Sequence, residues 1–185
     1  MARRLHCLAL VTAVLCPLYQ PAMAAPADTS APEFSVKAAY LYKFGGFVEW
    51  PETVFASAAS PTKLCLLGDD PFGQILDKVV DGQRIADHPV VVERLKAVMP
   101  KSGCQILYIS DRDDHKISAA LEAVRGENVL TITDGARTPQ TTGIINFVIA
   151  ENRVRFEIDD QAASVNGVTI SSKLLDLARS AKRRG

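Results

Sequence analysis

The feature that most constrains the fold of this sequence is a series of short apolar segments that alternate with helical segments. The segments predicted as strands are residues 63–67, 90–93, 104–109 and 129–133. Helical patterns cover residues 72–80 and 113–124. Strands that are apolar on both faces and alternate with helices are typical of a parallel sheet covered by helices. The sequence therefore predicts an α/β fold with a mainly parallel sheet.

The segment before this series has the pattern of one amphipathic helix. Val36, Tyr40 and Phe44 recur at four-residue spacing, which places them on one buried face. Ser35 is a suitable N-cap for a helix that starts near this point. Pro51 predicts the end of the helix, because the residue before a proline avoids the α region.

The last third of the chain predicts an antiparallel hairpin and a final helix. The hairpin strands are residues 144–150 and 153–158, joined by a short connection. Apolar and charged side chains alternate in the second strand, so Phe156 faces inward while Arg155 and Glu157 face outward. After a short helix that begins at about Asp159, the final helix has an apolar stripe formed by Leu174, Leu175, Leu177 and Ala178.

The first 24 residues have the composition of an export signal. Two arginines precede a short apolar run, and Ala22 and Ala24 are small residues that suit a signal peptidase. The run is shorter than the roughly 20 apolar residues needed to span a bilayer. We therefore expect export to the periplasm, with a cleaved signal peptide over residues 1–24, a flexible arm over 25–33 and a single domain over 34–185.

The charge balance argues against nucleic acid as a partner. The predicted leader carries two of the 21 basic residues and none of the 21 acidic ones, so the mature chain has a net charge of −2. Nucleic-acid binding needs clustered lysine and arginine that neutralise phosphates. One basic cluster lies near the C-terminus, where it either complements a helix dipole or contacts an anionic membrane surface; its members are Arg179, Lys182, Arg183 and Arg184.

Two cysteines, Cys65 and Cys104, would remain after removal of the leader. Two cysteines in an exported domain most often form one disulfide. Each lies in a predicted strand, and neighbouring strands can bring the two sulfur atoms within bonding range. The bond is either a structural staple or a redox switch, and no C-x-x-C motif marks either thiol as reactive.

No segment has a complete catalytic, nucleotide-binding or metal-binding motif. Gly68 and Gly73 have the spacing of a phosphate-binding loop, but Asp69 and Asp70 replace the residues that hold phosphate. The acidic residues before His115 fan apart at a helix start instead of converging as metal ligands do. We therefore predict no cofactor, no metal and no enzyme activity, and we favour a binding or regulatory protein.

The most specific part of the sequence is residues 36–51, where paired alanines and aromatic residues precede a Phe-Val-Glu-Trp-Pro motif. This segment resembles the opening signature of the YfiR family of exported proteins. The other segments that resemble this family are residues 64–73, 104–110, 129–134, 143–147, 154–158 and 172–178. The resemblance covers nearly all of the predicted mature chain.

The resemblance implies a periplasmic α/β protein, often a dimer, that is peripheral to the membrane and restrains an inner-membrane partner. In the best-known branch the partner is a diguanylate cyclase, and its restraint keeps cyclic di-GMP low and limits biofilm formation. Cys65 and Cys104 fall where one family disulfide lies, whereas a second cysteine pair of that branch has no counterpart in residues 144–156. A histidine kinase is the alternative partner.

Binding of such a partner requires an apolar patch with a polar rim. We predict this patch in the C-terminal hairpin and helix, with Phe156, Leu174 and Leu177 as anchors and Arg155 and Glu157 on the rim. For the three apolar residues, packing in the core is the alternative interpretation.

A second hypothesis is a periplasmic domain that senses a small molecule and reports it to a membrane receptor. Its ligand site would lie beyond the carboxyl ends of the parallel strands, near Gly68, Asp69, Ser110 and Asp111. A third is an enzyme, which a buried carboxylate with a raised pKa in a cleft would indicate.

Overall fold

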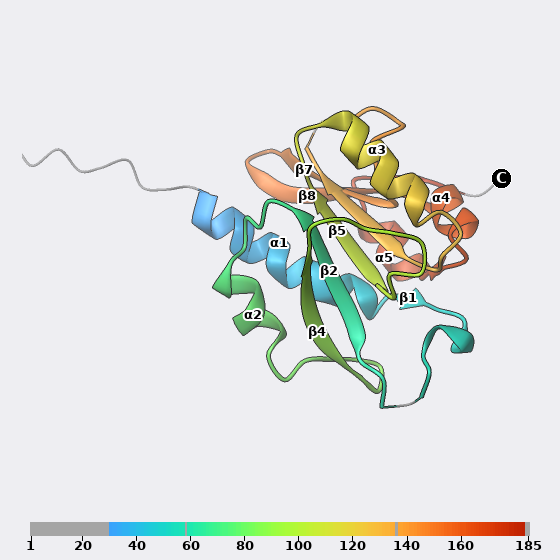
Figure 1. Ribbon diagram of the computed structural model, residues 1–185. Coiled ribbons are helices and arrows are strands. Elements are labelled where there is room, and N and C mark those ends of the chain that lie inside the picture. The colour runs from blue at the N-terminus through green and yellow to red at the C-terminus, as the bar shows by residue number, and fades with distance from the viewer. Residues whose placement is uncertain (1–29, 58, 136, 184–185) are drawn as a thin grey trace, which may run out of the picture.

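We analysed a computed structural model of the chain, in which residues 30–57, 59–135 and 137–183 are described (Figure 1). The predicted signal peptide, residues 1–24, and residues 25–29 of the predicted arm lie outside the described residues. Among the described helices, none combines the length and the apolar character needed to cross a membrane.

The described residues form a central eight-stranded sheet (Figure 1). Its strands, in spatial order, are β10 (Ser180–Lys182), β8 (Arg153–Asp159), β7 (Ile145–Ala150), β6 (Leu130–Asp134), β5 (Ile106–Ser110), β2 (Thr62–Gly68), β4 (His88–Leu95) and β3 (Arg84–Ile85). The strands from β7 to β4 are parallel, whereas β8 and β3 run antiparallel to their neighbours β7 and β4. The predicted α/β fold with a mainly parallel sheet and a C-terminal hairpin is therefore confirmed.

Helices cover the two faces of this sheet. The described helices are α1 (Ser30–Gly45), the 3-10 helix η1 (Glu52–Val54), α2 (Gln74–Val80), α3 (Asp114–Ala123), α4 (Asp160–Val165) and α5 (Ser172–Leu177). Alternate side chains of β2 face opposite ways, as the two-residue period of a strand requires. Leu64 and Leu66 pack in the cluster that contains α1 and α2, whereas Cys65 packs in the cluster that contains Ile117 of α3.

Helix α1 begins earlier than the sequence predicted. Its first residue is Ser30, whereas the predicted helix began at about Phe34 with Ser35 as its N-cap. Ser35 therefore lies inside the helix, and the predicted cap is wrong. The additional turn includes Glu33, which accepts a hydrogen bond from the ammonium group of Lys37 at 2.5 Å, and pairs at this i,i+4 spacing stabilise a helix.

Helix α1 also ends earlier than predicted, at Gly45 instead of just before Pro51. The residues that follow form β1 (Val48–Glu49), which pairs antiparallel with β9 (Thr169–Ile170). A Cβ atom at Gly45 would overlap the side chain of Ile85, so the lack of a side chain allows α1 to approach β3 this closely. A strand pairing between segments so far apart in the sequence overrides the local helical pattern.

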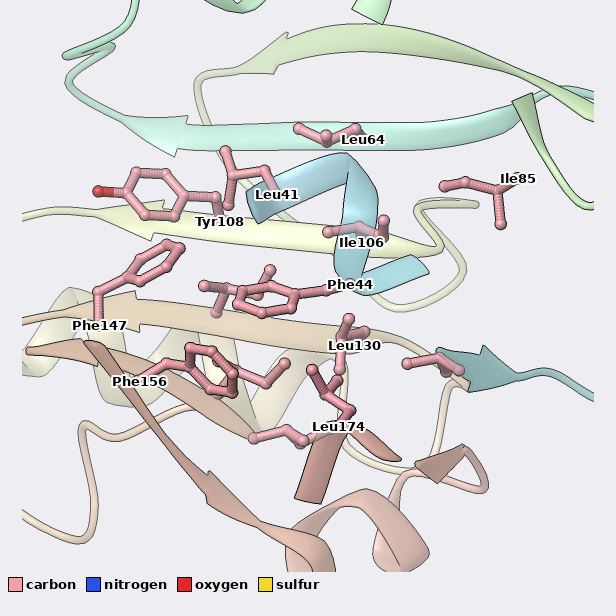
Figure 2. Close-up of a cluster of buried hydrophobic side chains, with 14 of the residues drawn as sticks. Leu41, Phe44, Leu64, Ile85, Ile106, Tyr108, Leu130, Phe147, Phe156 and Leu174 are labelled. Carbon is pink, nitrogen blue, oxygen red and sulfur yellow. The ribbon is translucent and has the colours of Figure 1, made fainter. Parts of the chain in front are cut away.

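Aromatic rings join α1 to the β7–β8 hairpin (Figure 2). The ring of Phe44 stacks on that of Tyr40 at 5.4 Å and meets those of Phe156 and Phe147 at 5.0 Å and 5.7 Å between centroids. Such aromatic pairs contribute about 0.5–1.5 kcal/mol each beyond the area that they bury. The cluster fixes the position of the hairpin against α1.

One arginine of β4 holds the turn between β2 and α2. Asp70 accepts hydrogen bonds from the backbone N–H groups of Phe72 and Gly73 at 2.8 Å and 3.0 Å, and from Arg94 Nε at 2.7 Å. Arg94 also donates to both carboxylate oxygens of Asp77 at 3.0 Å. Burial acts to raise the pKa of Asp70, but the hydrogen bonds from Arg94, Phe72 and Gly73 outweigh burial and lower it. The segment is a strand-to-helix turn.

Replacing Arg94 by alanine should lower the free energy of unfolding by about 1 kcal/mol near pH 7, because its ion pairs are partly exposed. The folded-state pKa of Asp70 lies below its ordinary value of 3.8, so its contribution is complete above that value and disappears as the pH falls through the folded-state pKa. Urea unfolding at about pH 7 and about pH 3 measures this dependence.

The difference between the native protein and Arg94→Ala should therefore shrink on acidification. Lys78→Ala is the control, because Lys78 is an exposed cation of α2 with no ion pair among the described residues. An Arg94→Ala effect of equal size at both pH values would contradict the role given to Asp70.

Candidate functional site

The predicted partner-binding residues lie at different depths in the structure. Phe156 and Leu174 are only 5% and 2% exposed and pack in the core, which is the alternative that the sequence left open. Leu177 of α5 is 66% exposed. Arg155 is exposed, and Glu157 is half-buried. Arg155 and Leu177 are therefore the members of the set that a partner can reach most easily.

Arg155 lines a groove of about 600 Å³ between the first turns of α1 and the tip of the β7–β8 hairpin. We call it the hairpin groove, and its lining residues are Pro32, Glu33, Val36, Tyr40, Ile149, Asn152, Arg153, Val154 and Arg155. Leu177 and Glu157 do not line it. The structure thus brings together one predicted residue, Arg155, and several residues that the sequence analysis did not select.

The hairpin wall of the groove follows from local sequence. Glu151 and Asn152 have φ values of 52° and 58°, as a two-residue type I′ turn requires, and asparagine tolerates this conformation well. The turn sets the register in which Ile149 pairs with Val154, so both side chains lie on the α1 face of the sheet. The same alternation directs Arg153 and Arg155 toward the other face of β8. Strand β10 pairs only with residues 157–159, so among the described residues β8 is an edge strand at 153–155, and the two arginines border the groove from this edge.

The groove combines apolar surface with free positive charge. Val36 is 44% exposed, so the prediction that it lies on a buried helix face is wrong. Ile149 is 52% exposed, and the two large apolar side chains share one depression. Among the described residues, Arg153 and Arg155 form no ion pair. An apolar floor with a guanidinium rim is the composition expected of a protein-binding surface.

The basic cluster near the C-terminus differs from the hairpin groove, because its cations are paired. Arg179 contacts Glu157 at 3.1 Å, and Lys182 contacts Asp159 at 3.1 Å. Arg183 contacts a carboxylate of α5 at 2.9 Å. Lys182 belongs to β10 and not to a helix end, so the dipole interpretation of this residue is wrong. Arg184 lies outside the described residues.

A buried lysine fixes the α1 wall of the groove. The Lys37 side chain is 3% exposed, and its ammonium group lies 2.6 Å from a carboxylate oxygen of Asp134 at the end of β6. The hydroxyl group of Tyr108 donates to the same carboxylate at 3.2 Å. Burial, reinforced by the negative charge of Asp134, raises the pKa of Tyr108. Glu33 completes the network, and it also lines the groove.

The carboxyl ends of β2 and β5, where the sequence analysis placed a possible ligand site, are joined directly. The backbone N–H of Asp69 donates to the carbonyl oxygen of Ser110 at 2.8 Å, and a Cβ atom at Gly68 would overlap that carbonyl group. A small cavity of about 290 Å³ lies beside this contact and is lined by Gly68 and Asp111, among others. The two strand ends therefore leave little room between them for a ligand.

The acidic residues before His115 have a structural role. Asp113 is the N-cap of α3, and its carboxylate accepts a hydrogen bond from the backbone N–H of His115 at 2.9 Å. Asp111 in turn accepts from the backbone N–H of Asp113 at 2.9 Å. Within the part of the chain that the structure describes, no group of three or more His, Cys, Asp or Glu side chains could hold a metal ion.

Cys65 and Cys104 form a disulfide, with 5.9 Å between their Cα atoms. Both residues are buried in the cluster that α3 covers, together with Leu107 and Ile117. The hairpin groove lies on the α1 face, so the sheet separates the disulfide from the groove. Strand β5 begins at Ile106, slightly later than predicted, and Cys104 precedes it.

The order of the parallel strands, β4-β2-β5-β6-β7, defines a doubly wound α/β domain, here with an internal disulfide and a lateral groove. The family model described as YfiR/HmsC-like matches residues 34–179, and the chain belongs to this family. The resemblance predicted from the sequence motifs is therefore confirmed. No curated protein matches the chain.

Membership in this family gives the general role of the protein. The family is regulatory and not catalytic, and it acts in the periplasm. The protein is thus a periplasmic regulator of a cyclic di-GMP pathway.

Proposed function

We propose that the protein binds the periplasmic part of an inner-membrane diguanylate cyclase through the hairpin groove and thereby limits cyclic di-GMP synthesis and biofilm formation. The observation that carries this proposal is the presence of exposed Val36 and Ile149 beside the unpaired Arg153 and Arg155 in one groove. Arginine is enriched at protein interfaces, where it contributes strongly to binding. The regulatory character of the family supports the same role.

The groove indicates the chemistry of the segment that it receives. A partner segment with one or two apolar side chains would cover Val36 and Ile149, and carboxylates at its edge would pair with Arg153 and Arg155. Binding alone does not restrain an enzyme, because the regulator must bind the inactive state better than the active one. A tenfold shift between the two states requires about 1.4 kcal/mol of differential binding.

Charge reversal in the groove should abolish regulation while it leaves the fold intact. In a strain that lacks the gene, cyclic di-GMP should rise, and the native protein should restore the low level. Arg153→Glu/Arg155→Glu should fail to restore it, because two repulsive contacts weaken partner binding by at least about tenfold. Both side chains are exposed, so the melting temperature should stay within a few degrees.

The matched control is Lys78→Glu/Lys96→Glu, which reverses two exposed, unpaired cations among the described residues near the opposite edge of the sheet. This variant should restore the low level of cyclic di-GMP. Full regulation by the groove variant would contradict the proposal and direct attention to Leu177 on α5. If deletion leaves cyclic di-GMP unchanged, the partner is not a cyclase that is active under those conditions.

A further inference from the structure

A second and larger cleft, of about 720 Å³, lies beside the C-terminal end of α1 and the start of β4. We call it the Trp50 cleft, and the residues that matter for its chemistry are Glu49, Trp50, Glu52, Phe55, Ile85 and His88. None of its lining residues lines the hairpin groove. Its volume is in the range of small-molecule sites, which is about 300–1,000 Å³.

Aromatic rings form one wall of the Trp50 cleft. The rings of Phe55 and His88 are stacked, with 3.7 Å between their centroids and 9° between their planes. His88 Nδ1 lies 2.7 Å from the carbonyl oxygen of Ser60. A carbonyl group can only accept, so Nδ1 carries a hydrogen and donates it to Ser60. These contacts hold the segment after η1 against the start of β4.

The charged groups of the cleft are all acidic. Glu49 and Glu52 are both exposed, and neither forms an ion pair with any residue that the structure describes. The residues that line the cleft include no lysine or arginine. The cleft therefore combines aromatic faces with unpaired negative charge, which is the reverse of the composition of the hairpin groove.

Trp50 is half-buried and is one of the residues that line the cleft. Its indole Nε1 is inaccessible to solvent and has no hydrogen-bond partner within residues 30–57, 59–135 and 137–183. Because this N–H group is out of reach of solvent, Trp50 offers a molecule in the cleft its ring and not a hydrogen bond.

We propose that the Trp50 cleft binds a small organic cation, namely a protonated amine with an apolar body. Aromatic faces attract such a cation through their quadrupoles, and tryptophan does so most strongly. Glu49 and Glu52 would neutralise the ammonium group, while Ile85 and Phe55 would cover the apolar body. Because the groove and the cleft share no lining residue, this proposal stands or fails separately from the proposed function.

Trp50 is the only tryptophan of the chain, so its fluorescence and its indole N–H resonance report on this cleft alone. The probes are phenethylammonium, 2-phenylethanol and phenylacetate, which share one aromatic body and differ in charge. The ammonium probe should cause a saturable change, with a dissociation constant at least about tenfold lower than those of the other two. No saturable change, or equal changes with all three probes, would overturn the proposal.

Substitution of the two carboxylates tests the source of the selectivity. Glu49→Gln/Glu52→Gln should weaken binding of the ammonium probe about tenfold and leave 2-phenylethanol unaffected. Glu122→Gln/Glu151→Gln is the matched control, because both residues are exposed and outside the cleft. Selectivity for the ammonium probe that is undiminished in Glu49→Gln/Glu52→Gln would overturn the proposal.

Discussion

Loss of the Cys65–Cys104 disulfide should lower the free energy of unfolding by about 4 kcal/mol, which is a large part of the stability of a domain of this size. The two cysteines are 39 residues apart, and the cross-link removes the corresponding loop entropy from the unfolded state. Cys65→Ala/Cys104→Ala removes the bond without leaving a thiol. Urea unfolding of this variant, and of the native protein with and without reductant, measures the effect.

The same variant distinguishes a staple from a switch. If the disulfide only stabilises the fold, regulation should decline only when the domain unfolds, because the sheet separates the disulfide from the hairpin groove. The control is Val124→Ala, which removes apolar contacts from the same buried cluster and keeps the bond. Loss of regulation by the disulfide variant while it is fully folded would indicate a redox switch. Equal unfolding midpoints with and without the bond would contradict the stabilising role.

Replacing Lys37 by methionine should cost about 3 kcal/mol, near the lower limit for breaking a buried ion pair. Methionine fills much of the space of the lysine stem, so the main loss is electrostatic. The carboxylates of Glu33 and Asp134 would lose their cation. Their side chains are 33% and 23% exposed, so water partly solvates them and limits the loss of stability. Urea unfolding gives the total cost, and hydrogen exchange of the first turns of α1 locates it.

Lys43→Met is the control for this experiment, because Lys43 is an exposed lysine on the same helix. It should change the stability by less than about 0.5 kcal/mol. A double-mutant cycle sharpens the test, since Asp134→Asn should be less costly in the Lys37→Met background than in the native protein. Equal costs for Lys37→Met and Lys43→Met would show that the buried ammonium group does not stabilise the fold.

Lys37→Met should also weaken regulation under conditions in which the domain stays folded. The network of Lys37 holds Glu33, and Glu33 belongs to the α1 wall of the hairpin groove. A loosened wall raises the entropic cost of ordering the groove around a partner. This result would connect the buried ion pair with the proposed binding surface.

Periodicity in the sequence predicted the buried strands well, because a strand that is apolar on both faces has few other stable environments. It also placed Phe156 inward and Arg155 outward, as the structure shows. It left open whether Phe156 packs in the core or anchors a partner. The answer depends on α1, whose Tyr40 and Phe44 cover Phe156 from a distant part of the chain.

The hairpin groove was only partly predictable for a similar reason. Alternation along β8 exposes Arg153 and Arg155, but it does not show that Val36 and Ile149 meet beside them. Lys37 was missed because a lysine in an amphipathic helix is ordinarily exposed, and its burial depends on Asp134 at the end of β6. The Trp50 cleft likewise requires η1, β3 and β4 to come together.

The sequence alone determined the α/β class, the order of most elements, the cysteine pair and the family, because these depend on local periodicity and on short motifs. The tertiary structure alone decided where α1 ends, that β10 pairs with β8, and which apolar side chains stay exposed. Burial and ion pairing are properties of pairs of segments. Local patterns constrain each segment separately, so they leave the relation between two distant segments undetermined.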